Sequence, residues 1–162
     1  MPSSQQTTRP ELVIRRTFDA PRALVWRAWS EREFATQWGP KGFTTPEREM
    51  DLRPGGAWHA RMISPDGKEY RQHGIVLEVV PQERLSFTFI WDETPDVEMT
   101  VTITLADRGE RTEMTFVQTG FDSLGSRDGH EGGWNEAFDE LTGVIAEIKK
   151  TGKRETGLGK RE

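Results

Sequence analysis

The chain has 162 residues, which suits one domain with a hydrophobic core of its own. Its formal net charge of -5 argues against a nucleic-acid-binding protein, because such a protein needs a clustered basic face. The absence of cysteine excludes disulfides, catalytic thiolates and cysteine-ligated zinc. Six Trp and eight Phe against one Tyr can either fill a core or line a pocket.

The two ends of the chain differ in composition from the rest. Residues 1–9 are polar, show no apolar core of a secretory signal and are expected to be flexible. No apolar stretch approaches the ~20 residues that span a bilayer, so we expect a soluble cytoplasmic protein without a membrane span. Residues 151–162 are rich in Gly and basic side chains. They predict a flexible tail, with binding to an acidic partner as the alternative, and the domain then covers residues 10–150.

The first predicted elements are a strand over Glu11–Phe18 and two short helices. Pro21 suits the first turn of a helix, because its missing N–H would be unpaired there, and apolar residues then recur on one face. Ser30 and Glu33 have the spacing of a capping box, which predicts a second short helix. The segment GPKG at residues 39–42 ends it.

The middle of the chain predicts strands joined by short turns. The segments PGG at 54–56 and PDG at 65–67 are turn signals, and residues 81–84 separate two further strands. Residues 97–105 alternate most regularly between apolar and polar. The predicted inward residues of this strand are Val97, Met99, Val101, Ile103 and Leu105. Short connections favour an antiparallel sheet with one solvated face.

Residues 129–150 predict one long amphipathic helix, whose apolar residues recur at alternating spacings of four and three. These residues are Trp134, Phe138, Leu141, Ile145 and Ile148. The apolar face of the sheet needs a cover, and this helix is the only predicted element long enough. We therefore predict an α+β fold. A curved antiparallel sheet of about six to seven strands wraps around the long carboxy-terminal helix, with two short helices after the first strand.

Four motifs occur in the same order as in a known family. They are FDAPRALVWRAWSEREFATQWGPKGFT, DLRPGGAWHARMISPDG, VVPQERLSFTF and GHEGGWNEAFDEL. Together they resemble the family named after the activator of the heat-shock chaperone ATPase, carboxy-terminal-domain type, within the START-like, birch-pollen-allergen-like (SRPBCC) superfamily. The resemblance covers roughly residues 11–150 and implies a helix-grip fold with a cavity between sheet and helix. Superfamily members bind lipids, steroids or plant hormones, and some act as polyketide cyclases or aromatases.

The predicted cavity would be lined by aromatic and methionine side chains, which offer apolar contact and adapt to the shape of a ligand. The candidate ligand-binding residues are Trp38, Phe43, Trp58, Met62, His73, Phe89, Met99, Val101, Trp134 and Phe138. Trp38 and Phe43 belong to the segment QWGPKGF, which we expect to form a lid-like loop. The alternative is a loop pinned by its own hydrophobic contacts. For Trp134 the alternative is tight packing of the helix against the sheet.

The histidines His59, His73 and His130 do not have metal-binding spacing, and no cofactor motif occurs, so we predict no metal and no cofactor. His73 would be able to orient a polar group of a ligand, or to act as a base, if it faced inward. The alternation around residues 70–80 leaves its face open, and a surface position is the alternative. We assign no catalytic residue.

Three functions are compatible with this sequence. The first is a module that binds a small apolar or amphipathic molecule, and we favour it because the excess of aromatic residues suits a pocket. The second is a cyclase- or hydrolase-like enzyme, which needs inward polar groups such as His73. The third is a protein-interaction module related to chaperones, which needs an exposed apolar patch.

Overall fold

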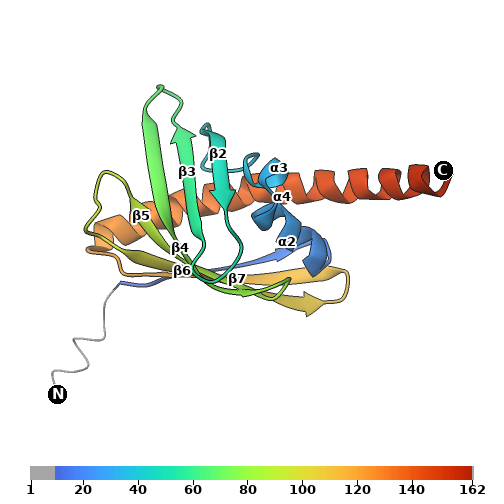
Figure 1. Ribbon diagram of the computed structural model, residues 1–162, viewed down its shortest axis with the longest axis horizontal. Coiled ribbons are helices and arrows are strands. Elements are labelled where there is room, and N and C mark those ends of the chain that lie inside the picture. The colour runs from blue at the N-terminus through green and yellow to red at the C-terminus, as the bar shows by residue number, and fades with distance from the viewer. Residues whose placement is uncertain (1–9, 162) are drawn as a thin grey trace, which may run out of the picture.

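Seven strands form one antiparallel sheet in the computed structural model, which describes residues 10–161 and the side chains of residues 10–151 (Figure 1). The strands are β1 (Leu12–Phe18), β2 (Thr44–Met50), β3 (Ala57–Ile63), β4 (Glu69–Val80), β5 (Arg84–Trp91), β6 (Met99–Arg108) and β7 (Arg111–Thr119). The helices are α2 (Arg22–Ser30), α3 (Arg32–Ala35) and α4 (Leu124–Arg161). The strand order is β1-β7-β6-β5-β4-β3-β2, with β1 and β2 at the edges. The predicted α+β helix-grip fold is confirmed.

The sheet is strongly curved. In Figure 1, β2, β3 and the upper part of β4 stand as an arm above the floor that β5, β6, β7 and β1 form. The register between β4 and β5 shifts between Val76 and Glu78, which marks a bulge in β4. An extra residue in one strand kinks that strand and increases its twist. The curvature gives the sheet a concave side, which α4 crosses (Figure 1).

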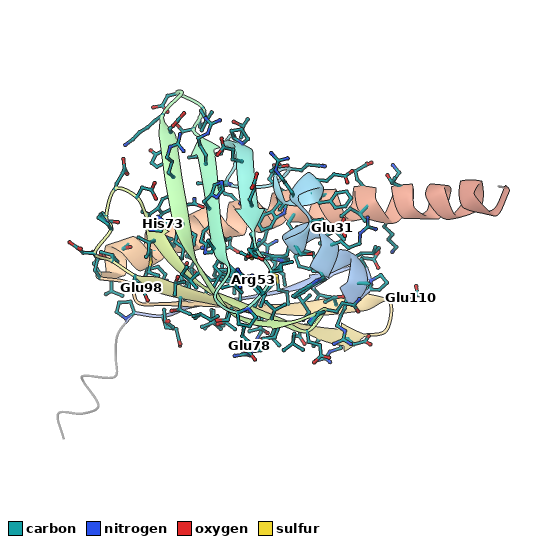
Figure 2. All side chains as sticks on the ribbon, viewed as in Figure 1. Glu31, Arg53, His73, Glu78, Glu98 and Glu110 are labelled. Carbon is teal, nitrogen blue, oxygen red and sulfur yellow. The ribbon has the colours of Figure 1, made fainter. Side chains whose placement is uncertain are left out.

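Alternation along the strands decides which side chains reach the concave side. In β3, Trp58, Ala60 and Met62 are buried, whereas the intervening His59 is exposed. Strand β6 follows the predicted alternation, and its buried residues are Met99, Val101, Ile103 and Leu105. Glu78 of β4 projects from the side of the sheet away from α4 (Figure 2). One face of the sheet is therefore apolar and covered, and the other is solvent-exposed and mainly polar, with Val13, Ile75 and Leu77 as exposed apolar side chains.

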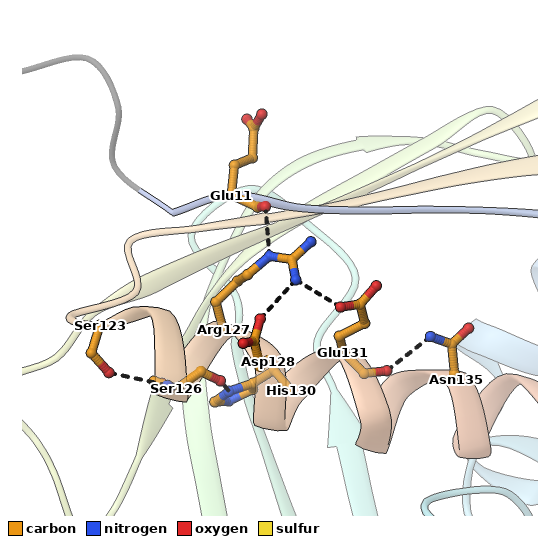
Figure 3. A network of polar contacts seen from close by, with 8 residues as sticks. All are labelled: Glu11, Ser123, Ser126, Arg127, Asp128, His130, Glu131 and Asn135. Carbon is orange, nitrogen blue, oxygen red and sulfur yellow. Dashed lines mark hydrogen bonds and ion pairs between the residues drawn. The ribbon is translucent and has the colours of Figure 1, made fainter. Parts of the chain in front are cut away.

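Helix α4 begins at Leu124, earlier than the predicted start at Gly129. The reason is a cap outside the predicted segment: the backbone N–H of Ser126 donates to Oγ of Ser123 at 3.0 Å (Figure 3). Such a bond satisfies one of the free N–H groups of the first turn. The residues between this cap and Gly129 show no apolar periodicity, so the sequence pattern does not indicate the earlier start.

The middle of α4, from Phe138 to Ile148, supplies the apolar face that the concave side requires. Its buried residues include Phe138, Leu141, Ile145 and Ile148, which confirms the predicted face. Each large apolar side chain buried in this way contributes about 1.5–3 kcal/mol to stability. Trp134, one turn before Phe138, is only half-buried. The packing between sheet and helix is therefore dense after Trp134 and looser before it.

Two arginines connect α4 to the edge strand β1 and to Glu11, the residue that precedes this strand. Nε of Arg127 donates to the carbonyl of Glu11 at 3.1 Å, and its Nη1 lies 2.6 Å from Oε1 of Glu131 (Figure 3). Nη2 of Arg16 donates to the carbonyl of Asn135 at 3.0 Å. These bonds hold the amino-terminal half of the helix at a fixed position over the sheet.

The predictions for the two ends of the chain stay predictions. Residues 1–9 lie outside the described residues. The backbone of α4 stays helical as far as Arg161, through most of the range predicted as a tail, and the side chains of residues 152–161 lie outside the description. In the described part of the chain, no helix combines the length and the apolarity that a membrane crossing needs.

Candidate functional site

A cavity of about 670 Å³ opens between the arm of the sheet, the β5–β6 connection and the first turns of α4. Its apolar walls are chiefly Phe43, Met62, Tyr70, Phe89, Trp91, Met99 and Trp134. A smaller cavity of about 320 Å³ lies toward α2 and α3. Its apolar walls are chiefly Trp29, Met50, Trp58 and Phe87. The two cavities share Arg48, Gln72, Phe89 and Trp134, so they adjoin.

The helical wall of the larger cavity includes three positions that carry no side chain. Gly125, Gly129 and Gly133, here called the glycine stripe, all line it. Residues four apart lie on one face of a helix, so the stripe presents bare backbone to the cavity. A Cβ added at Gly129 or Gly133 would find no atom within 4 Å. The glycines are therefore not required by close packing, and their effect is to leave space.

Trp134 stands between the two cavities as a fixed wall. Its Nε1 donates to Oε1 of Gln118 at 2.8 Å, and Gln118 is fully buried. The Trp134 ring also packs on Phe116, with the ring centroids 4.6 Å apart. A buried indole usually needs a partner for its N–H, and this bond sets the orientation of the ring.

His130 links the helix to the sheet in its neutral form. Nε1 of Trp91 donates to Nε2 of His130 at 2.9 Å, so Nε2 carries no proton. Nδ1 lies 2.8 Å from the carbonyl of Ser126 and donates to it. Burial lowers the pKa of His130, an effect that the carbonyl of Ser126 and the charge of Asp122 partly oppose. Both nitrogens are occupied, so His130 positions Trp91 and is not a free base.

Arg48 brings a positive charge to both cavities. It lies on β2 directly opposite Ala60 of β3, and Ala60 lies opposite Gln72 of β4. Directly paired residues project to the same face, so Arg48 and Gln72 flank the small Ala60 side chain on the concave side. The Arg48 guanidinium stacks over the Trp38 ring at 4.6 Å. Burial lowers the pKa of Arg48 to about 10, so it remains charged at neutral pH.

Arg48 and Gln72 have unused hydrogen-bonding capacity. Among the described side chains, neither forms a hydrogen bond through its polar head group, and Arg48 forms no ion pair. Gln72 is only 5% exposed, so the space that its amide meets is the cavity. Buried polar groups are normally satisfied, and a charge without a partner is costly. Arg48 and Gln72 are therefore two polar groups without a protein partner in the part of the wall that the sheet forms.

The structure brings most of the predicted site residues together. Those that line one or both cavities are Phe43, Trp58, Met62, Phe89, Met99 and Trp134. Val101 and Phe138 lie beneath them as fully buried core residues. Their rings and methyl groups support the walls without reaching the open space.

Two further residues of the predicted ligand-binding set, Trp38 and His73, do not line either cavity. Trp38 is 2% exposed, and its Nε1 donates to the carbonyl of Ala28 at 3.1 Å, so it anchors the loop and does not gate it. The backbone N–H of Lys41 also donates to Oε1 of Glu136 at 3.1 Å, which pins this loop to α4.

His73 lies on the outer side of the sheet. It directly opposes the exposed His59, and its Nδ1 lies 2.7 Å from Oδ1 of Asp92 (Figure 2). The inward residue of this part of β4 is its neighbour Gln72. His73 is therefore excluded from the cavity wall. For the same reason, His73 cannot act as a base toward a ligand in the cavity.

Sequence reasoning missed the polar and the glycine parts of the site. Arg48 lies in the segment TTPEREM, where no run of apolar residues marks the inward face. Gln72 lies on the same face of β4 as Tyr70, Gly74 and Val76. Because Gly74 has no side chain, it interrupts the apolar pattern that would otherwise indicate that Gln72 points inward. Within residues 10–151, no three His, Asp or Glu side chains converge where they could hold a metal ion.

A curved antiparallel sheet around one long helix, with an open cavity between them, defines a helix-grip domain of the SRPBCC type. The chain belongs to the family described as Activator of Hsp90 ATPase homolog 1-like protein, whose model matches residues 19–146. Family and fold together suggest a ligand-binding or chaperone-related module.

Several solved bacterial structures are similar to this chain. Protein NE0264 from Nitrosomonas europaea is 30% identical, with a TM-score of 0.75 over 86% of this chain and 96% of that one. Protein CV1439 from Chromobacterium violaceum is 28% identical, with a TM-score of 0.75 over 83% and 96%. The AHSA1 protein from Silicibacter pomeroyi is 24% identical, with a TM-score of 0.75 over 85% and 98%, and supports the fold alone. No curated protein matches the chain.

Proposed function

We propose that this protein is a small-molecule-binding module that holds an apolar or amphipathic ligand in the cavity between the sheet and α4. The observation that carries the proposal is the open cavity of about 670 Å³ beside the glycine stripe. Small-molecule sites typically have volumes of ~300–1,000 Å³ and mostly apolar walls. The methionines Met62 and Met99 in the wall would adapt to the shape of a ligand.

Affinity would come mainly from apolar burial against these walls. Each Å² of apolar surface removed from water contributes about 25 cal/mol before the costs of association are subtracted. The walls are already fixed without a ligand, because Trp134 is bonded to Gln118 and Trp91 to His130. A preformed site loses little free energy to ordering when it binds.

The test uses two leucine substitutions in neighbouring positions of α4. Gly133→Leu places a branched side chain in the cavity, whereas Gly132→Leu lies on an exposed part of the helix that does not line it. The probe is N-phenyl-1-naphthylamine, a neutral molecule whose fluorescence rises in apolar surroundings. We expect the wild type and Gly132→Leu to bind it and Gly133→Leu to bind at least about tenfold more weakly, equivalent to a loss of roughly 1.4 kcal/mol.

A bound ligand should also raise the melting temperature, because it stabilises only the folded state. The proposal is wrong if the wild type binds no probe, or if both leucine variants bind it as well as the wild type. Circular dichroism of both variants would confirm that the helix is intact.

The two alternatives predicted from the sequence have no comparable support. The enzyme hypothesis rested on His73, which lies outside the cavity wall. The protein-interaction hypothesis needs an exposed apolar patch. The outer face of the sheet exposes the apolar side chains Ile75 and Leu77, but it also carries ion pairs such as that of Arg84 with Glu78 at 2.7 Å. The cytoplasmic location expected from the sequence stays a prediction.

A further inference from the structure

The unpaired charge of Arg48 limits the kind of ligand that the cavity can favour. An arginine in an apolar wall normally pairs with a carboxylate of the protein, and here no described carboxylate does so. The nearest acidic side chains along β2 are already engaged. Glu47 pairs with Arg61 at 3.4 Å, and Glu49 pairs with Arg32 at 3.3 Å.

The row Arg48–Ala60–Gln72 has the geometry of a binding site for a small polar group. Adjacent strands lie ~4.8 Å apart, so the Arg48 and Gln72 backbones are separated by roughly twice that distance. Both side chains are long and Ala60 between them is short, so both head groups can reach one group above Ala60. Guanidinium and amide N–H groups are donors, and both would be used by an acceptor with two oxygens.

We propose that the cavity selects amphipathic organic monoanions, with a carboxylate bound by Arg48 and Gln72 and the apolar body lying along the glycine stripe. The proposal rests on the proposed function and names the ligand class for the same cavity. The carboxylate would take the Arg48 guanidinium as its partner and the Gln72 amide as a second donor. The apolar body would then contact Phe89 and Trp134, which border both cavities.

Charge balance favours one negative charge over none or two. A neutral ligand would displace water from the half-buried Arg48 guanidinium without giving it a hydrogen-bond acceptor, which is unfavourable. A dianion such as a phosphate monoester would leave one charge uncompensated. The other charged groups around the larger cavity are acidic, namely the exposed Glu93, Asp122 and Glu136 at its rim. These carboxylates disfavour additional negative charge.

A purely structural role for Arg48 predicts different behaviour. The stacking of Arg48 on Trp38 can stabilise the loop that Trp38 anchors. If this were its whole contribution, replacing Arg48 would lower the melting temperature but would not change which ligands bind. The experiment therefore measures ligand preference and stability separately.

The experiment measures displacement of N-phenyl-1-naphthylamine by dodecanoate, dodecan-1-ol and dodecyl phosphate. On the wild type we expect dodecanoate to bind at least about tenfold more tightly than either of the others, a difference of roughly 1.4 kcal/mol. In Arg48→Met, which keeps an unbranched apolar stem but removes the guanidinium, dodecanoate should lose this advantage over dodecan-1-ol. The neutral probe should still bind this variant, which shows that the cavity is intact.

A second variant covers the case in which Arg48→Met does not fold. Arg48→Lys keeps the charge but loses the planar fork, so it should retain only part of the preference for dodecanoate. Equal displacement by dodecanoate and dodecan-1-ol on the wild type would overturn the monoanion proposal, as would an unchanged preference in the Arg48 variants. In both cases the probe still binds, so the proposed function stands. Failure of the wild type to bind the probe would instead remove both proposals.

Discussion

Gly74 in β4 leaves room for a hydrogen bond between its two neighbouring strands, β3 and β5. Its neighbour across the sheet is Trp58 of β3, whose Nε1 donates to the carbonyl of Thr88 in β5 at 2.7 Å. A Cβ on Gly74 would lie 2.0 Å from the Thr88 oxygen and 2.4 Å from the indole nitrogen. No real side chain fits there, so the absence of a Cβ allows Trp58 to stand as a wall of the smaller cavity.

We therefore predict that Gly74→Ala lowers the free energy of unfolding by at least about 2 kcal/mol, through overpacking and loss of the Trp58 bond. Urea denaturation followed by circular dichroism would measure this change. Gly132→Ala is the control, because a Cβ there meets no atom within 4 Å and alanine favours helix. A Gly74→Ala protein as stable as the wild type would contradict the role assigned to this glycine.

His130 makes stability depend on pH in a defined direction. Burial holds its folded-state pKa below the ordinary value of 6.5. Below that value the unfolded chain binds more protons at this site than the folded chain, so stability falls as the pH falls. Protonation of Nε2 would also remove the acceptor for the Trp91 N–H.

The melting temperature of the wild type should accordingly decrease from about pH 7.5 to about pH 5. In His130→Gln this decrease should be smaller, since glutamine does not titrate. Thermal denaturation at several pH values would measure how steeply the melting temperature depends on pH in each protein. If the melting temperatures of the two proteins decreased equally with falling pH, another titratable group would be responsible for the loss of stability in acid.

At the scale of elements, α4 combines two segments with different roles. Its middle segment, from Phe138 to Ile148, packs apolar side chains on the sheet, and its first turns carry the glycine stripe. Glycine inside a helix costs up to about 1 kcal/mol relative to alanine. Since Gly129 and Gly133 have open space around them, this cost is not offset by closer packing.

The double variant Gly129→Ala/Gly133→Ala should therefore be more stable than the wild type by about 1–2 kcal/mol, while its cavity becomes smaller. Ligand affinity should fall as stability rises. Gly143→Ala is a matched control, because Gly143 lies in the same helix with open space around it but does not line the cavity. Its stability should rise with no change in probe binding. Denaturant titration and probe titration together separate the two effects.

At the scale of the whole molecule, the sheet is connected to the helix by polar bonds at the edge strand as well as by the core. Besides its bond to the Asn135 carbonyl, Arg16 donates to Oδ1 of Asn135 at 3.2 Å and pairs with Asp139 at 3.0 Å. The Arg16 side chain is 25% exposed, so solvent screens these contacts only in part. They join residues that are far apart in the chain.

Replacing Arg16 by leucine should lower the free energy of unfolding by about 1–2 kcal/mol, because the Asn135 carbonyl loses its charged donor. Arg111→Ala should change it by less than about 0.5 kcal/mol, since Arg111 is largely exposed and lies 4.0 Å from Asp19. Urea denaturation of both variants provides the comparison. If the two substitutions changed the free energy of unfolding equally, the contacts of Arg16 with α4 would make no specific contribution to stability.

Much of the fold could be predicted from local periodicity. The alternation over residues 97–105 matches β6, and the spacing of Phe138, Leu141, Ile145 and Ile148 matches the buried face of α4. These patterns record which side of an element meets the core, and they need no knowledge of distant residues. Part of the aromatic and methionine wall, such as Phe89 and Met99, lies at positions that the sequence predicted, whereas Tyr70 and Trp91 were not among the predicted site residues.

Local sequence patterns were enough to predict a sheet with one apolar face, a long helix to cover it and aromatic residues between them. The outward direction of His73, the position of Arg48 and Gln72 on either side of Ala60, and the open space beside the glycine stripe became apparent only in the folded protein. Periodicity is a property of a single segment, whereas the register between strands and the volume beneath a helix depend on how distant segments pack.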